Sequence, residues 1–133
     1  MTFRTLLIIK AVVCLVFGLF LLLAPNTLLG LLGTILTEGG TFTAREYGAA
    51  LMGTLLLTWF ARDVGAADAR RAILLDLLIY DLIGMVVTLW VVFSGVLNLL
   101  GWSIVVVYLF FTVGSGYLLV KEKPSHTVQA SKV

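Results

Sequence analysis

The sequence predicts an all-α protein in which four transmembrane helices form a bundle, with a short interfacial or re-entrant half-helix between helices 1 and 2. Of the 133 residues, 61% are hydrophobic and only 12% are charged, whereas about a quarter of a soluble domain is charged. Four apolar runs have the roughly 20 residues that a helix needs to cross about 30 Å of hydrocarbon. Lysine and arginine cluster at the ends of these runs. Lipid must therefore surround most of the chain.

The four predicted spans cover residues 5–24, 42–61, 72–93 and 97–120. They must be helices, because an isolated strand would leave backbone groups unpaired in lipid. Pro25 ends the first span, since proline cannot continue a helix without losing a hydrogen bond. Residues 1–123 form one predicted transmembrane domain, and residues 124–133 a disordered cytoplasmic tail. A cleaved signal peptide is a weaker interpretation of the first run, because Lys10 interrupts it and no small-residue cleavage site follows.

The half-helix is predicted within residues 26–40, where the apolar stretch LLGLLGTIL is too short to cross a bilayer. Asn26 or Thr27 would cap its start, and the Gly39-Gly40 pair would release the chain into the second span. The alternative is an apolar loop packed on the outer end of the bundle.

The distribution of positive charge predicts the orientation. Three clusters fall on one side of the predicted bundle, while the loop between the third and fourth spans has no charge. The positive-inside rule places that side, with both termini, in the cytoplasm, so the protein is expected to be a multi-pass component of the inner (plasma) membrane. The clusters are Arg4; Arg62, Arg70 and Arg71; and Lys121, Lys123 and Lys132.

The sequence lacks the residues that several kinds of functional site require. Cys14 is the single cysteine and His126 the single histidine, which excludes an internal disulfide, a CxxC pair and a histidine-rich metal site. No nucleophile–base pair stands out, so no catalytic site and no cofactor are expected. The charges form no basic stripe, and nucleic acid is not an expected partner. The expected partners are membrane lipids, a second copy of the chain or a larger membrane complex.

Polar residues inside the spans are the candidate site, because charges are costly at membrane depth. At 1.5 Å per residue, Lys10 lies about 9 Å from the inner end of its helix, Asp76 about 6 Å and Asp81 about 13 Å, so the three can meet. Hydroxyl side chains at helical spacing are expected to pack beside them. The predicted intramembrane polar cluster comprises Lys10, Thr54, Thr58, Asp76, Tyr80, Asp81, Tyr108, Thr112 and Ser115.

Two interpretations of this cluster stay open. In the structural one, Lys10 pairs with an aspartate and the pair fixes helix register. In the functional one, Asp81 is a proton or cation site, with Asp76 in support, because two carboxylates face a single lysine. A second, outer-face polar group comprises Glu38, Arg45, Glu46 and Tyr47. Either these side chains extend to the membrane–water interface, or they form an outer polar pocket.

Four short motifs lie at the ends of the predicted helices. Arginine and Gly-Ala open the second span, Trp-x-Ala-Arg ends it, Ala-Arg-Arg starts the third, and Asn-x-x-Gly-Trp precedes the fourth. On these motifs the chain resembles, over residues 5–120, a family of small bacterial four-helix integral membrane proteins of unknown function. The resemblance implies the architecture and a bacterial inner-membrane setting, but no activity. The motif residues are Arg45, Gly48, Ala49, Trp59, Ala61, Arg62, Ala69, Arg70, Arg71, Asn98, Gly101 and Trp102.

Three functions remain open from the sequence. The first is a non-enzymatic structural or accessory component, acting as a homo-oligomer or as a subunit of a complex. The second is a small proton- or cation-coupled transporter that uses Asp81 and Asp76. The third is a lipid- or isoprenoid-binding protein with a pocket under the half-helix, near Leu28 to Leu36.

Overall fold

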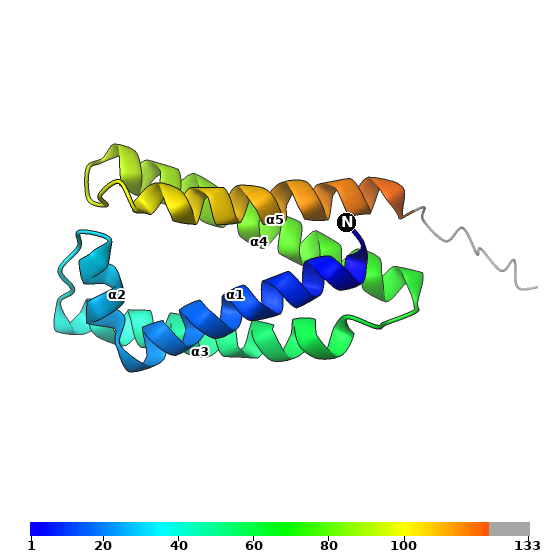
Figure 1. The fold of residues 1–133 in the computed structure, drawn as a ribbon, viewed down its shortest axis with the longest axis horizontal. Helices are drawn as coiled ribbons and strands as arrows, with labels where there is room; N and C mark the ends of the chain where they lie inside the picture. Colours follow the sequence, from blue (N-terminus) through cyan, green and yellow to red (C-terminus); the bar gives the residue numbers. More distant parts are fainter. Residues whose placement is uncertain (123–133) are drawn as a thin grey trace, which may run out of the picture.

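The computed structural model describes residues 1–122, and within that range the chain is all-α, 82% helical and without strands (Figure 1). The five helices are α1 (Phe3–Leu23), α2 (Pro25–Leu31), α3 (Glu38–Ala61), α4 (Ala67–Phe93) and α5 (Gly101–Lys121). The predicted tail, residues 124–133, lies outside the described residues, as does residue 123.

Local chemistry explains where the helices begin and end. The Thr2 hydroxyl caps α1 by accepting a hydrogen bond from the Thr5 amide at 3.2 Å. Pro25 is the first residue of α2, where its missing N–H costs nothing. The Thr37 hydroxyl caps α3 by accepting from the Gly40 amide at 3.2 Å. The break after α1 therefore comes where the proline predicted it.

Several predicted boundaries need correction. The short helix is α2, and neither Asn26 nor Thr27 caps it; its start has no side-chain cap. Gly39 and Gly40 do not release the chain but lie inside the first turn of α3, which Thr37 has already capped. Helices α3 and α4 also begin earlier than predicted, and α5 begins later, at Gly101.

Three helices, not the predicted four, are long and apolar enough to span a membrane: α1, α4 and α5. Helix α3 has the length, at 24 residues. It falls short in composition, because Glu38, Arg45 and Glu46 lie in its first half. The chain is compatible with a membrane protein on the strength of the three apolar helices.

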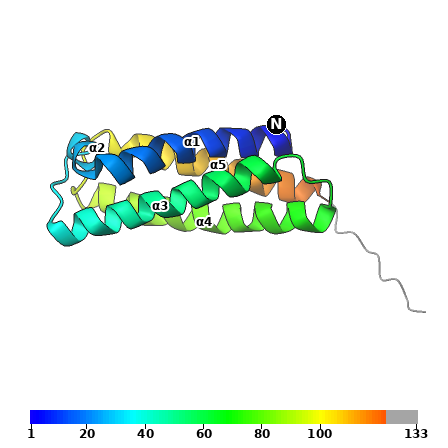
Figure 2. The ribbon, with the colours of Figure 1, turned by 90° about the horizontal axis from the view of Figure 1, so that it is seen from below.

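The four long helices form two pairs (Figures 1 and 2). Helix α1 packs along α3, and α4 packs along α5, while the two pairs touch each other mainly through α1 and α5. The α1–α3 approach is close: a Cβ on Gly48 would lie 2.9 Å from the Gly18 carbonyl oxygen. Helices α3 and α4 meet at their shared loop and diverge from it (Figure 1).

The end that carries the N-terminus is closed. An apolar core fills it, and ion pairs join its segments: Arg4 Nε lies 3.1 Å from Asp63 Oδ1, and Arg70 pairs with Glu122. The N-terminus, the α3–α4 loop and the last turn of α5 all lie at this end (Figure 1). The described part of the three positive clusters is thus gathered at one end. The core residues are Phe3, Leu6, Leu7, Leu74, Leu77, Phe111 and Leu118.

The opposite end is held by a small set of hydrogen bonds around α2. Asn98, in the α4–α5 turn, donates from its Nδ2 to the Leu31 carbonyl and from its backbone amide to the Leu32 carbonyl, both at 2.8 Å. The Thr34 hydroxyl donates to the Val96 carbonyl at 3.0 Å. These hydrogen bonds, which we call the latch, hold the end of α2 and the loop after it against the α4–α5 turn.

Candidate functional site

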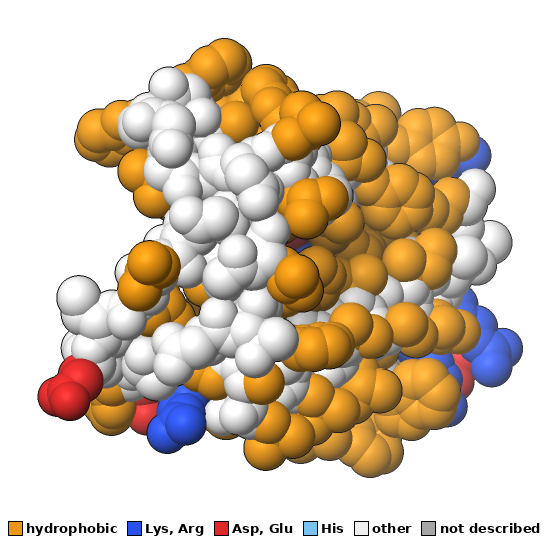
Figure 3. Space-filling model, turned by 60° about the vertical axis from the view of Figure 1, so that its left-hand side comes forward, with side chains coloured by type: hydrophobic (Ala, Val, Ile, Leu, Met, Phe, Trp, Pro, Cys, Tyr) orange, Lys and Arg blue, Asp and Glu red, His pale blue; other side chains and the backbone are white. Residues whose placement is uncertain are grey.

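A cavity of about 560 Å³ lies between the two helix pairs, in the half of the bundle that contains α2. Its volume falls within the roughly 300–1,000 Å³ typical of small-molecule sites. Most of its wall is apolar, contributed by α1, α2, α3 and α5. Figure 3 shows the face at the α2 end, which is hollowed near its centre; apolar side chains surround the hollow, and the exposed charged side chains lie toward the margins. The apolar lining comprises Val13, Phe17, Leu21, Leu28, Leu29, Leu32, Leu36, Ala44, Leu51, Ile104 and Val107.

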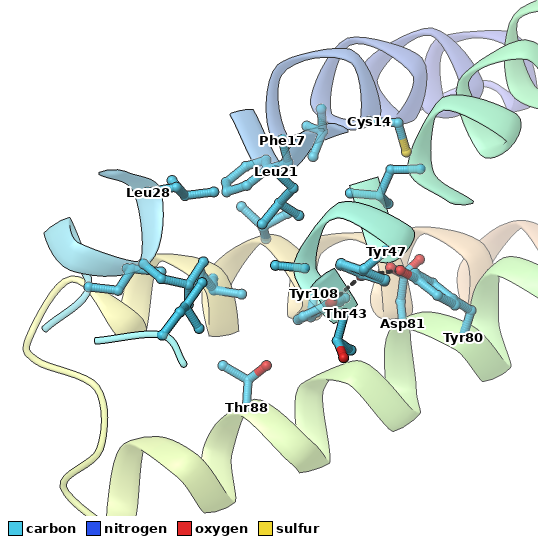
Figure 4. A pocket seen from close by; sticks show the side chains of 18 of the residues that line it. Cys14, Phe17, Leu21, Leu28, Thr43, Tyr47, Tyr80, Asp81, Thr88 and Tyr108 are labelled. Atoms are coloured by element: carbon cyan, nitrogen blue, oxygen red, sulfur yellow. Dashed lines mark hydrogen bonds between the residues drawn. The ribbon is translucent and has the colours of Figure 1, made fainter. Parts of the chain in front are cut away.

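Helix α2 and the loop after it cover the outer end of this pocket through Leu28, Leu29, Leu32 and Leu36. The predicted location under the half-helix, near Leu28 to Leu36, is therefore where a pocket lies. The other end of the pocket is polar, with Tyr47, Tyr80, Tyr108 and Asp81 gathered there (Figure 4).

The base of the pocket holds a buried ion pair. Lys10 on α1 donates from Nζ to Asp81 Oδ1 on α4, and both side chains are almost fully inaccessible. The lysine also lies over two aromatic rings, 5.0 Å from the Tyr80 centroid and 4.4 Å from that of Phe111. Such contacts stabilise a buried cation. Asp81 Oδ2 has no hydrogen-bond partner among the described residues.

Three tyrosines lie beside this pair and come from three helices. The Tyr47 hydroxyl on α3 bonds to the Tyr80 hydroxyl on α4, and it lies 3.0 Å from the Tyr108 hydroxyl on α5. The Tyr80 and Tyr108 rings meet edge to face, with centroids 6.4 Å apart. The small Gly84 makes room for them, since a Cβ there would lie 2.5 Å from the Tyr108 ring. Tyr47 thus links the two helix pairs at the polar base.

The structure brings together part of the predicted intramembrane polar cluster. Lys10, Tyr80, Asp81 and Tyr108 meet at the pocket base. Asp76 does not join them, because its side chain lies on the exposed face of α4. The two predicted carboxylates therefore do not share one lysine.

The hydroxyls of the predicted cluster are used differently. Thr54 donates to the Ala50 carbonyl at 3.2 Å and Thr58 to the Thr54 carbonyl at 2.8 Å, so both are satisfied within α3. Thr112 and Ser115 lie on α5 with buried oxygens that lack a partner among residues 1–122, and neither lines the pocket.

The predicted outer-face polar group is also divided. Glu38, Arg45 and Glu46 lie exposed on α3, whereas Tyr47 points into the pocket and joins the other tyrosines. Among the described residues, no group of three or more His, Cys, Asp and Glu side chains could hold a metal ion.

Sequence reasoning missed most of the pocket wall. Phe17, Leu21 and Val107 are apolar residues in an apolar chain, so nothing in their type marks them as lining a cavity. Thr43 and Thr88 line it too, and their hydroxyls donate to their own helices, to the Gly39 and Gly84 carbonyls at 3.0 and 2.8 Å. Tyr80, Gly84 and Thr88 recur every four residues and so share one face of α4, but the same spacing includes Asp76, which does not line the pocket.

Known proteins offer no match: no protein-family model fits the chain, and no curated protein or solved structure is significantly similar to it. The resemblance to small bacterial four-helix proteins therefore stays a prediction. What the protein does has to be argued from the pocket itself.

Proposed function

We propose that this protein binds a lipid-class molecule in the pocket beneath α2. The observation that carries the proposal is a 560 Å³ cavity with an apolar wall and a polar base. That combination suits a ligand with a long apolar body and one polar group, since a few fixed polar side chains orient a ligand that apolar surface holds. A binding role, not catalysis, is the function that this arrangement favours.

The proposal includes four membrane crossings. Helices α1 and α4 both run from the N-terminal end toward the α2 end (Figure 1). If both span the bilayer, the chain between them must return across the same thickness, and α3 is the helix in that position. Its 24 residues would extend about 36 Å, enough for the hydrocarbon core. Its charged residues lie on its outer half, where they can reach the headgroups.

In this proposal the closed, charged end faces the cytoplasm, in keeping with the positive-inside rule. Both termini are then cytoplasmic, and the pocket lies in the outer half of the bilayer. The bacterial inner membrane is the setting that the sequence resemblance implies.

The divergence of α3 from α4 supplies a route for the ligand. Beyond the Tyr47–Tyr80 hydrogen bond that joins these helices, Thr43 on α3 and Thr88 on α4 line the pocket, and the two helices have few further contacts. A lipid could pass between them directly from the bilayer, without crossing water.

Of the two other functions left open by the sequence, neither has an observation of comparable weight. For conduction, an ion would have to pass from Asp81 through the apolar core around Leu7, Leu74 and Leu77. An accessory role in a complex is compatible with ligand binding and would be an additional property.

Recovery of bound lipid tests the proposal. The protein is purified in mild detergent, and apolar molecules are extracted and quantified by mass spectrometry. We expect about one molecule per chain. Ala44→Phe, which fills the pocket wall, should lose most of it, whereas Ala50→Phe, on the exposed face of the same helix, should not. Equal recovery from the two variants, or none from the unmodified protein, would overturn the proposal.

A further inference from the structure

The polar base of the pocket has more free hydrogen-bond acceptors than donors. The Thr43 and Thr88 hydroxyls already donate to helix carbonyls, so only their oxygen lone pairs face a ligand. The three tyrosine hydroxyls bond to one another, which uses two of their three protons. Asp81 Oδ2 also lacks a partner among the described residues, but it is buried and therefore does not count as open to a ligand. A ligand group that donates a hydrogen bond would fit this surplus.

The local charge excludes an ionic head group. Lys10 and Asp81 neutralise each other, so the base has no net charge to hold an anion or a cation. The lysine Nζ lies over the Tyr80 and Phe111 rings and the side chain is almost fully buried, so it is not open to a carboxylate ligand. The apolar surroundings would make any unpaired charge costly.

We infer that the ligand is a neutral lipid with a terminal hydroxyl, such as a long-chain or isoprenoid alcohol. Its hydroxyl donates to an acceptor oxygen of the tyrosines or of Thr43 and Thr88, which line the pocket between the tyrosines and α2, and its chain extends toward Leu28 and Leu32. This inference rests on the proposed binding function and specifies the head group that the site selects.

The preferred head group can be identified with four probes that share one chain length and differ in their polar end: hexadecanol, its methyl ether, hexadecanoate and hexadecylammonium. Binding of tritiated hexadecanol to the full chain in nanodiscs is measured, with the other three as competitors. We expect the ether, which lacks a donor, to compete about tenfold more weakly than unlabelled hexadecanol. Hexadecanoate and hexadecylammonium should be weaker as well.

Substitutions on the protein side give a matched control. Thr43→Val with Thr88→Val removes two acceptor oxygens and keeps the side-chain shape, so affinity for hexadecanol should fall severalfold while affinity for the ether is unchanged. Thr54→Val, on the same helix but outside the pocket, should alter neither. Saturable binding with the ether equal to the alcohol, or with an ionic probe strongest, would overturn the head-group assignment and leave the pocket as a lipid site. No saturable binding of any probe would overturn both.

Discussion

The two halves of the bundle are built from the same four long helices but differ in how these helices meet. At the N-terminal end, Leu7, Leu74 and Leu77 pack without remaining exposure, and ion pairs join the segments around them. At the α2 end, α3 and α4 have diverged, and the space between the pairs is the pocket. The comparison teaches that close packing and cavity volume are separated along the bundle axis, and that the proposed binding belongs to the half with the cavity. The Lys10–Asp81 pair lies at the boundary between the two halves.

Removing one charge of the Lys10–Asp81 pair should lower the free energy of unfolding more than any other change considered. Lys10→Met leaves the buried Asp81 carboxylate without its partner, which typically costs about 3–5 kcal/mol. Thermal unfolding in detergent would measure the loss. The double variant Lys10→Met with Asp81→Leu should recover most of it, because neither charge then remains buried. If Lys10→Met were as stable as the unmodified protein, the ion pair would not be what holds the two halves together.

Matched truncations sharpen the contrast between the halves. Leu77→Ala removes a buried side chain from the closed core, and Leu29→Ala removes one that lines the pocket. Because lipid is as apolar as leucine, only packing is lost, so we expect about 2 kcal/mol for Leu77→Ala, the low end for buried leucines. Leu29→Ala should cost no more than about 0.5 kcal/mol. Equal losses in denaturant titrations would contradict the division into a packed half and an open half.

At the latch we expect a local effect instead of a loss of global stability. Asn98→Ala removes the hydrogen bond to the Leu31 carbonyl and the one that Asn98 Oδ1 accepts from the Leu100 amide. The cost should be about 1–2 kcal/mol locally. Hydrogen exchange of residues 28–36 should therefore accelerate, while exchange around Leu77 stays unchanged. Ser94→Ala is the control, because that hydroxyl bonds only within the end of α4. Unchanged exchange at residues 28–36 would mean that the latch does not hold α2.

The helices could be predicted from the sequence because hydrophobicity and proline placement are local properties. That Lys10 pairs with an aspartate of the third span could also be predicted, since axial rise fixes depth, but depth did not identify which aspartate it would be. Depth alone predicts that Asp76 joins the cluster, but its side chain is exposed. At 100° per residue, the spacing of five residues from Asp76 to Asp81 turns their side chains about 140° apart around α4. Tyr47 was assigned to the outer group for the same reason, although it lies about 200° around α3 from Arg45.

The pocket could not be predicted in this way. It depends on the angle at which α3 leaves α4, and that angle is set by contacts between helices distant in sequence, such as Gly18 with Gly48 and Asn98 with Leu31. Apolar residues that line a cavity have the same composition as those that face lipid. The short apolar stretch of residues 28–36 was the one local feature that indicated a segment covering a pocket, and the pocket lies at that end of the bundle.

Photo-crosslinking tests the central claim most directly. A long-chain alcohol that carries a diazirine at the end of its chain is added to the protein in nanodiscs, and the labelled peptides are mapped by mass spectrometry. The account predicts labelling at Leu28, Leu29 and Leu32, which cover the pocket, and its loss when excess hexadecanol competes. Labelling confined to the exposed residues Ile83, Val86 and Val87 of α4, and insensitive to competition, would contradict it.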